Sequence, residues 1–484
     1  MKRLYFLVFG CYLATLMVVS SCMKDETFTE SPSRPLIFSS DTVSFDTVFT
    51  SLGSITKDLI VYNNNSEGVR LTSVRLASNG NSGFRVNVDG LYGTQFSDVE
   101  ICSDDSIFIF VEVTADEQNS DSPILISDSL LFLLPNGITQ TVILEAYGQD
   151  AYIIKGVTFS ADTLLTGSRP YIIYDSLRVD SGVVLTVDSG TTLCFHDKAH
   201  MEVHGTICAQ GTVSHPVVFR GDRLDWLLWY VPYDNIDALW EGIHIHPESK
   251  DNVFDHCDIH SGNYGIRVDA PRHQNQSLSL TNSVIHNVAG HGLELTGCEV
   301  LIGNCEITNA GGDCLHIVGG DTKVQFSTIA QFYPWDECGH ALSFSNVIGT
   351  DTLVPLRNLW FNSCILTGYT DDEIYGTRYD DDETAFNYHF ANSLLITDTT
   401  SIDSSRFVNC IFESDTTFSQ HKNFRDWLKE DYSSDFRLDS ISKARNLGRF
   451  DVTSDSGQQI YATDRLGILR PKETPDAGCY QYSE

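Results

Sequence analysis

Two short phrases recur along the second half of the chain at a nearly fixed interval. The first phrase combines a polar or aromatic residue, a nearby Cys or Ser and a large apolar residue. It occurs at 256–259, 282–285, 304–307, 326–329, 362–365, 392–395 and 409–412. Its apolar positions Ile259, Ile285, Ile307 and Ile329 are 26, 22 and 22 residues apart. A second phrase, a small residue before an apolar one, recurs at 242–243, 265–266, 292–293, 314–315 and 341–342. Two short strands in each period predict the coils of a solenoid.

A leucine-rich repeat and a parallel β-helix both have a period of this length. The leucine-rich repeat needs an L-x-x-L-x-L frame, which these phrases lack. Stacked coils of a β-helix would place Ile over Ile and align Asn282 with Asn304, so that side-chain amides hydrogen-bond along the axis. The phrases therefore predict a parallel β-helix in an all-β chain.

Residues 151 to about 480 resemble right-handed parallel β-helix proteins. The resemblance rests on the stretches 185–193 and 203–212, and on the closing stretches 435–438, 464–467 and 476–480. It implies a right-handed β-helix over residues 151–450 and a C-terminal closing segment over residues 451–484. Such motifs are diagnostic of a fold and not of an activity.

Residues 36–150 show alternating strands without these phrases. Apolar residues at 107, 109, 111 and 113 fall on one face of a strand, and Phe108 and Phe110 fall on the other. Pro135-Asn136-Gly137 is a turn signal. Six or seven strands in about 110 residues predict an antiparallel β-sandwich. The segment resembles immunoglobulin-like modules that precede larger domains in bacterial surface proteins, which implies a spacer or binding role.

The N-terminus has the charge pattern of a secretory signal, with Lys2 and Arg3 before an apolar run at 4–19. Val19-Ser20-Ser21-Cys22 resembles the lipobox of bacterial lipoproteins, which implies a signal peptide at 1–21, acylation of Cys22 and a tether at 22–35. Lys24-Asp25-Glu26 resembles an acidic export signal of some Gram-negative bacteria. We therefore expect a lipid-anchored protein of the outer membrane, exposed on the cell surface.

The chain is strongly acidic, with 65 acidic and 31 basic side chains and a formal charge of −34. Nucleic acid and anionic membrane surfaces are therefore poor partners, and the lipid anchor is the expected link to a membrane. Of 13 cysteines, Cys11 and Cys22 belong to the processed region. The remaining set is odd in number and scattered, which favours buried free thiols over a disulfide framework or a zinc ribbon.

Long insertions interrupt the coils between Phe219 and Ile243, between Ile329 and Leu342, and after Ile365. Insertions at one corner of every coil emerge on one flank, so we expect the three loops to be neighbours. Aromatic faces near carboxylates can hold sugar rings, although the same side chains can also pack the loops onto the coils. The candidate ligand contacts are Trp226, Trp229, Tyr233 and Trp335.

The third insertion carries acidic residues at 371–373 and 380–383, which we expect to be solvated. It lacks the spaced Asp, Asn and Gly frame of a calcium loop, so no cofactor is predicted and Ca²⁺ remains an alternative. His244 and His246 alternate on one strand face, with His256 and His260 a coil later, and imidazoles at this spacing can share a metal. Outward-pointing histidines without a fixed carboxylate are usually solvated, so no metal is predicted.

Gly311-Gly312-Asp313-Cys314 and the stretch 338–343 look like two motifs of the polygalacturonase family, in which aspartates act as acid and base. This resemblance implies Asp313 and His340 as site residues. The family has paired aspartates where this chain has Gly312-Asp313, the coil at 291–293 offers none, and no Arg-x-Lys motif follows. A glycosidase needs two carboxyl groups at one bond, and one is left.

These observations lead us to expect a non-catalytic surface lipoprotein whose β-helix binds a glycan or another surface macromolecule. The alternative is a divergent β-helix glycoside hydrolase that acts on polysaccharide through Asp313. A purely structural stalk is a third possibility.

Overall fold

The computed structural model describes residues 26–272, 275–379, 383–400, 402–413, 422–450 and 461–483. The chain divides into two compact units at Asp150 and Ala151. The predicted signal peptide at 1–21 and the predicted lipidation site Cys22 lie outside the described residues. Across the described ranges, no helix has the length and apolar character needed to cross a bilayer.

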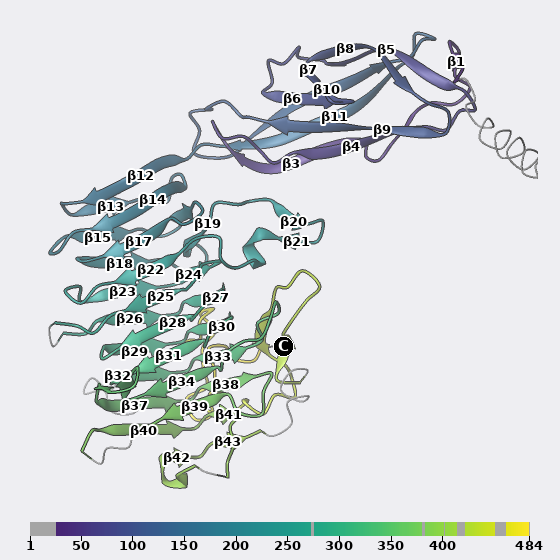
Figure 1. The fold of residues 1–484 in the computed structure, drawn as a ribbon. Coiled ribbons are helices and arrows are strands. Elements are labelled where there is room, and N and C mark those ends of the chain that lie inside the picture. The colour runs from purple at the N-terminus through teal and green to yellow at the C-terminus, as the bar shows by residue number, and fades with distance from the viewer. Residues whose placement is uncertain are drawn as a thin grey trace, which may run out of the picture. The chain divides into compact units, whose positions relative to one another are not determined.

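The first unit contains two sheets around one apolar core (Figure 1). The first sheet consists of β1 (Phe28–Thr29), β5 (Gly68–Leu76), β10 (Ile124–Leu133), β11 (Thr139–Gln149) and β3 (Thr42–Phe49), with β8 (Gln95–Ile101) on β5. The second consists of β2 (Ile37–Phe38), β4 (Lys57–Asn63), β9 (Asp105–Val113), β6 (Phe84–Val88) and β7 (Leu91–Gly93). Ile109 and Val111 are fully buried while Phe108 and Phe110 are exposed, as the alternation predicts.

Most strand pairs of this unit are antiparallel, as predicted, and two pairs are parallel. β11 pairs with β3, and β1 with β5, in parallel. The chain leaves β3 for β4 in the other sheet, so no hairpin imposes an antiparallel neighbour on β3. The predicted tether differs too, because its residues Phe28 and Thr29 pair with Gly68 and Val69 of the sandwich.

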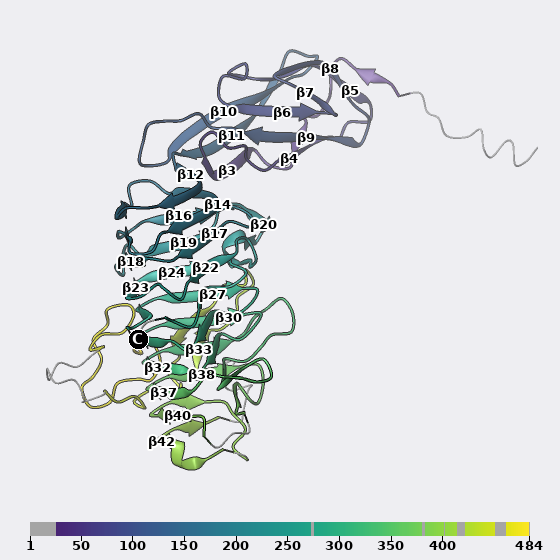
Figure 2. The ribbon, with the colours of Figure 1, turned by 60° about the vertical axis from the view of Figure 1, so that its left-hand side comes forward.

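The second unit is a parallel β-helix with three strands in each coil (Figures 1 and 2). An 18-stranded sheet runs as two files, which we call file A and file B, and β12 (Tyr152–Phe159) and β14 (Tyr171–Val179) span both. File A consists of β16 (Thr192–Phe195), β19 (Val217–Gly221), β24 (Cys257–His260), β27 (Val284–Val288), β30 (Glu306–Ala310), β33 (Thr328–Gln331), β38 (Ile365–Gly368), β41 (Leu394–Leu395) and β43 (Ile411–Phe412). File B consists of β17 (His200–Val203), β22 (Gly242–Ile245), β25 (Ile266–Val268), β28 (Leu293–Thr296), β31 (Leu315–Val318), β34 (Leu342–Ser345) and β39 (Ile374–Thr377).

The third strand of each coil belongs to a separate 10-stranded sheet. Its strands are β13 (Thr163–Leu165), β15 (Val184–Val187), β18 (Thr206–Gln210), β23 (Asn252–Asp255), β26 (Leu278–Thr281), β29 (Glu299–Gly303), β32 (Gly320–Gln325), β37 (Leu356–Asn362), β40 (Phe386–Ala391) and β42 (Phe407–Val408). Each coil therefore runs from file A to file B, then to the third sheet and back. We call the turn between the two files the A–B corner.

The two sequence phrases are the strands of files A and B. Ile259, Ile285, Ile307 and Ile329 are direct neighbours on successive strands of file A, as predicted. The second phrase aligns in the same way on file B, where Ile266, Leu293, Leu315 and Leu342 follow one another. All eight side chains are fully buried, and burial of each stabilises the fold by about 1.5–3 kcal/mol.

Asparagines mark the turn between the third sheet and file A. Asn282 and Asn304 have φ angles of 51° and 55°, in the left-handed region that Asn tolerates better than most residues. The Asn304 amide donates a hydrogen bond to Asn282 Oδ1 at 3.0 Å, which confirms the predicted ladder. Asn392 and Asn409 continue the ladder farther along.

The C-terminal region folds back along the outside of file A. The last coil strand is β43, which ends at Phe412, although the sequence predicted coils to residue 450. Residues 423–450 and 461–483, which we call the strap, contain β44 (Phe424–Asp426) and β45 (Asp435–Leu438). Tyr480 donates a hydrogen bond to Glu306 on β30. The strap thus lies beside the middle coils, where Figure 1 shows its yellow ribbon, and it covers outward residues of file A.

Candidate functional site

The outer face of file B carries one polar or aromatic side chain per coil. Parallel pairing places these residues in one column, with neighbours about 4.8 Å apart. The column consists of Glu202, His244, Arg267, Glu294, His316, Ser343 and Tyr375. Apart from Ser343, these side chains are at least partly exposed. File B therefore presents a line of hydrogen-bonding groups along the solenoid axis.

Asp313 forms the centre of a cluster where this column meets the A–B corner. Its Oδ1 accepts a hydrogen bond from the backbone N–H of His340 at 2.9 Å, and its Oδ2 accepts one from Ser343 Oγ at 2.5 Å. The Nδ1 atoms of His316, His340 and His291 lie 3.3, 3.5 and 3.6 Å from its carboxylate. The cluster joins side chains from three consecutive coils.

The charge state of the cluster follows from these contacts. Burial by itself raises the pKa of Asp313, but hydrogen bonds from His316, His340 and Ser343 outweigh it and hold the pKa well below the usual range. The contact with Asp313 raises the pKa of His340. His291 Nδ1 accepts the Asp313 N–H at 2.9 Å, so this nitrogen carries no proton. The ionised Asp313 carboxylate thus lies beside three imidazole side chains that are 30–37% exposed.

Two of the three glycines in these motifs, Gly312 and Gly339, are required by the packing around Asp313. A Cβ on Gly312 would lie 2.8 Å from His291 Nδ1, and a Cβ on Gly339 would lie 2.5 Å from Asp313 Oδ1. Close packing of neighbouring coils around Asp313 therefore requires glycine at both positions. The nearby carboxyl Glu373 is fully buried and accepts hydrogen bonds from Ala341 and Thr370, so it faces the protein and not the surface.

Long loops leave the A–B corner on both sides of this cluster. The loop at 222–241 contains β20 (Trp226–Leu228) and β21 (Val231–Pro232). Trp229 is 88% exposed, and Trp226 and Trp335 are 44% and 36% exposed. The Arg223 guanidinium lies over the Tyr233 ring, 4.0 Å from its centroid. Trp226 and Trp229 therefore offer accessible rings, whereas Tyr233 is partly occupied by Arg223.

Contacts join this loop to the one at 332–341. The Tyr333 hydroxyl donates a hydrogen bond to Asp237. Both loops also reach the strap, because Asn235 donates to the Asp431 carbonyl at 2.7 Å and the rings of Trp335 and Tyr432 lie 4.2 Å apart. The first two insertions are thus neighbours, as the sequence predicted.

The third insertion divides between two corners. Residues 371–373 lie at the A–B corner, where Tyr375 on β39 stacks against His340 at 5.2 Å. The described residues on either side of the more acidic part, Tyr379 and Glu383, lie between β39 and β40, at the corner between file B and the third sheet. The expectation that all three loops leave one corner is wrong for this part. Residues 380–382 lie outside the described residues.

The histidines of β22 and β24 have fixed carboxylate partners. His246 Nε2 lies 2.8 Å from Glu202 Oε2, and His244 Nε2 lies 2.9 Å from Asp269 Oδ2. His260 is buried, with its Nδ1 2.9 Å from Asp258 Oδ1. The prediction that these side chains are simply solvated is wrong. The sequence repeat did not reveal the partner of His246, because the loop at 222–241 makes the separation between Glu202 and His246 longer than one coil period.

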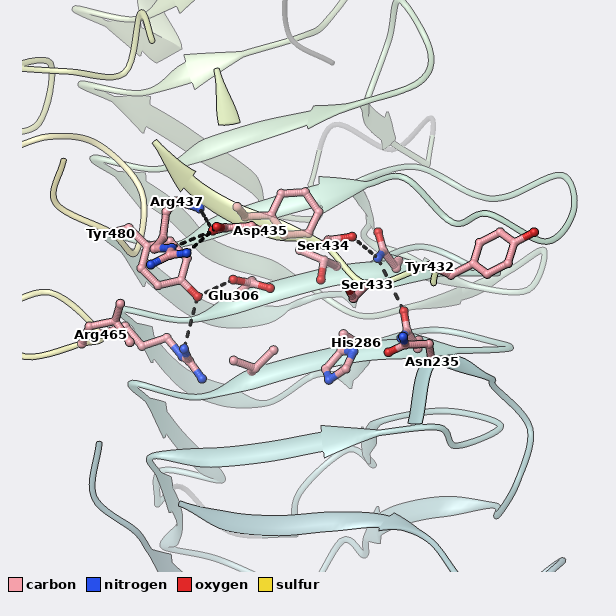
Figure 3. Close-up of a pocket in the computed structure, with 16 residues that line it drawn as sticks. Asn235, His286, Glu306, Tyr432, Ser433, Ser434, Asp435, Arg437, Arg465 and Tyr480 are labelled. Atoms are coloured by element: carbon pink, nitrogen blue, oxygen red, sulfur yellow. Dashed lines mark hydrogen bonds and ion pairs between the residues drawn. The ribbon is translucent and has the colours of Figure 1, made fainter. Parts of the chain in front are cut away.

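A cavity of about 360 Å³ lies between file A and the strap (Figure 3). Burial raises the pKa of Glu306 in its wall, and Tyr480 donates to this carboxyl at 2.6 Å. Arg465 donates in turn to the Tyr480 hydroxyl at 3.2 Å. No sequence pattern indicated this cavity, because the residues that file A and the strap contribute to its walls are more than 120 residues apart. These polar contacts hold the strap on the coils.

Comparisons with known proteins bear on the fold. The family described as "Right handed beta helix region" matches residues 145–329. No curated protein matches this chain.

Several solved structures are similar at low identity. The catalytic unit of a GH87 alpha-1,3-glucanase from Streptomyces thermodiastaticus is 10% identical, with 74% of this chain and 76% of that chain covered and a TM-score of 0.28. The pectate lyase Pel9A is 13% identical, with 69% and 88% covered and a TM-score of 0.28. A protein of unknown function from Porphyromonas gingivalis W83 is 11% identical, with 27% and 61% covered and a TM-score of 0.19. Together, the family match and the coil geometry give this chain a right-handed β-helix domain after an N-terminal β-sheet unit.

Proposed function

We propose that the β-helix domain binds a polysaccharide chain along the A–B corner and the adjacent face of file B. The observation that carries the proposal is the Asp313 cluster, an ionised carboxylate among three part-exposed imidazoles, beside loops with exposed tryptophans. Carboxylates and imidazoles bind sugar hydroxyls, and exposed indole rings stack on sugar faces. A repeated column of polar groups suits a repeating ligand.

The negative charge of the chain limits which class of polysaccharide it can bind. A formal charge of −34 opposes the approach of a polyuronate. The ionised Asp313 lies beside this face, which also carries Glu294, whose Oε2 accepts a hydrogen bond from Arg267 Nε at 2.7 Å. A neutral polysaccharide is therefore the proposed ligand.

A second candidate function is cleavage of that polysaccharide. The observation that favours it is the contact between Asp313, whose pKa is lowered, and His340, whose pKa is raised. Such a pair offers a proton donor, His340, beside a carboxylate that stays ionised and can stabilise a developing positive charge, although so weak a base accepts protons poorly. Glycosidases ordinarily use two carboxyl groups, and Glu373 faces the interior. Binding is therefore the first proposal and hydrolysis the second.

Binding and turnover should be measured on neutral and acidic polysaccharides with three variants. Combined replacement of Trp229 and Trp335 by alanine should weaken binding about tenfold, since each stacking contact contributes about 0.5–1.5 kcal/mol. Tyr92→Ala is the matched control, because Tyr92 is 73% exposed on the first unit. Asp313→Asn should weaken binding and, if the chain is a hydrolase, abolish release of reducing ends. Binding that is absent in the unaltered protein, or equal in all variants, would refute the proposal.

We also propose that Cys22 is acylated and anchors the protein at the outer surface of a Gram-negative cell. The support is Val19-Ser20-Ser21-Cys22 and the acidic stretch after it. Several acyl chains hold a protein stably on a membrane. Cys22→Ser should move the protein from the membrane fraction to the soluble fraction, with Cys102→Ser as the control. A membrane fraction that retains the Cys22→Ser protein would contradict this.

A further inference from the structure

We propose that Glu202, His204, His244 and His246 form a binding site for one Zn²⁺ ion, independent of the polysaccharide proposal. Glu202 lies on β17 and His244 on β22, which are adjacent strands of file B, and His204 and His246 follow these strands directly. We call them, together with Glu248, the Glu202 site. On file B, β25 and β28 separate β22 from β31. Asp313 precedes β31, so the Glu202 site is distinct from the Asp313 cluster.

The distances in the Glu202 site suit a shared cation. One ligand atom each from Glu202, His244 and His246 lies within 4.8 Å of the other two. His204 Nε2 lies 3.6 Å from Glu202 Oε2. Zn–N and Zn–O bonds of about 2.0–2.1 Å place tetrahedral ligand atoms about 3.4 Å apart. Small side-chain rotations would therefore bring three imidazole nitrogens and one carboxylate oxygen within bonding distance of a single ion.

His204 gives an independent indication of a missing partner. Its Nδ1 lies 2.5 Å from Glu248 Oε1, and a proton shared there leaves the lone pair on Nε2. His204 Nε2 is buried and has no hydrogen-bond partner among the described residues. A carboxylate behind a histidine that offers its other nitrogen is the usual support of a zinc ligand. A cation would satisfy this acceptor, which is otherwise costly to bury.

The imidazoles of the site also pack closely against one another. The rings of His204 and His246 stack with centroids 3.8 Å apart, an arrangement that two charged imidazoles would oppose. Borderline-soft Zn²⁺ prefers such a set of imidazoles with one carboxylate to the all-oxygen sets that Ca²⁺ and Mg²⁺ require.

Two other groups of two histidines and one carboxylate serve as internal controls. In the group of Asp258, His260 and His286, His260 Nδ1 lies 2.9 Å from Asp258 Oδ1, and its buried Nε2, like that of His204, has no hydrogen bond within the described part of the chain and lies 3.6 Å from a carboxylate oxygen, here Asp234 Oδ1. In the Asp313 group, His291 Nδ1 accepts a backbone N–H and His316 Nδ1 lies 2.7 Å from Ser343 Oγ. The protein therefore already uses nitrogens of the Asp313 group, and the Asp258 group offers two imidazoles where the Glu202 site offers three.

Equilibrium dialysis of the EDTA-treated full chain against ZnCl₂ tests the site directly. We expect one Zn²⁺ per chain. His246→Ala and Glu202→Gln should lower the affinity at least 100-fold, and Glu248→Gln should lower it 10- to 100-fold through the loss of its support for His204. His316→Gln should leave the affinity within about twofold, as it leaves the proposed ligands intact.

Co²⁺ provides a second readout, because a four-coordinate site of this kind gives visible absorption bands that the Glu202→Gln protein should lack. Circular dichroism should first establish that each variant is folded, and Glu248→Gln keeps the test open if an alanine variant unfolds. Unaltered protein without bound Zn²⁺, Zn²⁺ affinity that survives Glu202→Gln and His246→Ala, or affinity that is lost in His316→Gln would each overturn the proposal.

Discussion

Replacement of Arg470 by alanine is expected to lower the free energy of unfolding by about 3–5 kcal/mol and to release the strap from the coils. Arg470 is 2% exposed, and its guanidinium donates to Asn304 Oδ1 and to the carbonyl oxygens of Asp476 and Gly478 at 3.0–3.1 Å. It also lies 4.3 Å from the centroid of the Phe326 ring.

The expected loss of stability follows from the buried carboxyl groups that would remain without Arg470. Burial lowers the pKa of Arg470 to about 10, and the carboxyl groups of Asp464 and Asp476, each 2% exposed, oppose that shift. Removal of one partner leaves a buried charge without compensation. Urea unfolding and limited proteolysis of residues 423–483 measure the loss. Lys472→Ala removes an equal charge from an exposed position of the same segment and should change stability by less than about 0.5 kcal/mol. Equal behaviour of the two variants would contradict the assigned role.

Stability should also fall by about 3 kcal/mol between pH 6.5 and pH 9.5 in a way that depends on His260. Burial by itself lowers the pKa of His260, but Asp258 and Asp234 outweigh it and raise the pKa to about 9. The unfolded chain has a histidine pKa of about 6.5. The stabilisation is therefore complete below about pH 6.5 and is lost as the pH rises through 9.

The comparison with His260→Gln isolates this effect. Arg220, Asp234, Asp258 and His286 all face the His260 ring or its partners, and they remain in the variant. His260→Gln should be less stable at pH 6.5, and its free energy of unfolding should change less with pH. Parallel curves for the two proteins, measured by urea unfolding at each pH, would show that His260 is not a buried cation.

The sequence predicts the coils well because each coil repeats one local pattern. Ile285 and Ile307 contact each other because both follow the same phrase, and Asn282 and Asn304 pair for the same reason. Wherever no insertion interrupts the repeat, the strand register of a solenoid can therefore be predicted from the repeat length alone.

The strap and the histidine networks could not be predicted in this way. Arg470 meets Asn304, and Tyr480 meets Glu306, through contacts that no period relates. His204 and Glu248 are one coil apart in space but separated by a long loop in sequence. For the candidate site, two sequence motifs identified Asp313 and His340 as candidate residues. The role of Ser343 and His316 as partners of Asp313 depends on coil register and became clear only from the structure.

The most direct test of the proposed binding surface is hydrogen–deuterium exchange of the full chain with and without a bound neutral polysaccharide. Backbone amides at 222–241, 311–316 and 332–341 should exchange more slowly in the complex, because they form the A–B corner around Asp313. Protection confined to residues 26–150, or to the third sheet, with no change at the A–B corner, would contradict the account.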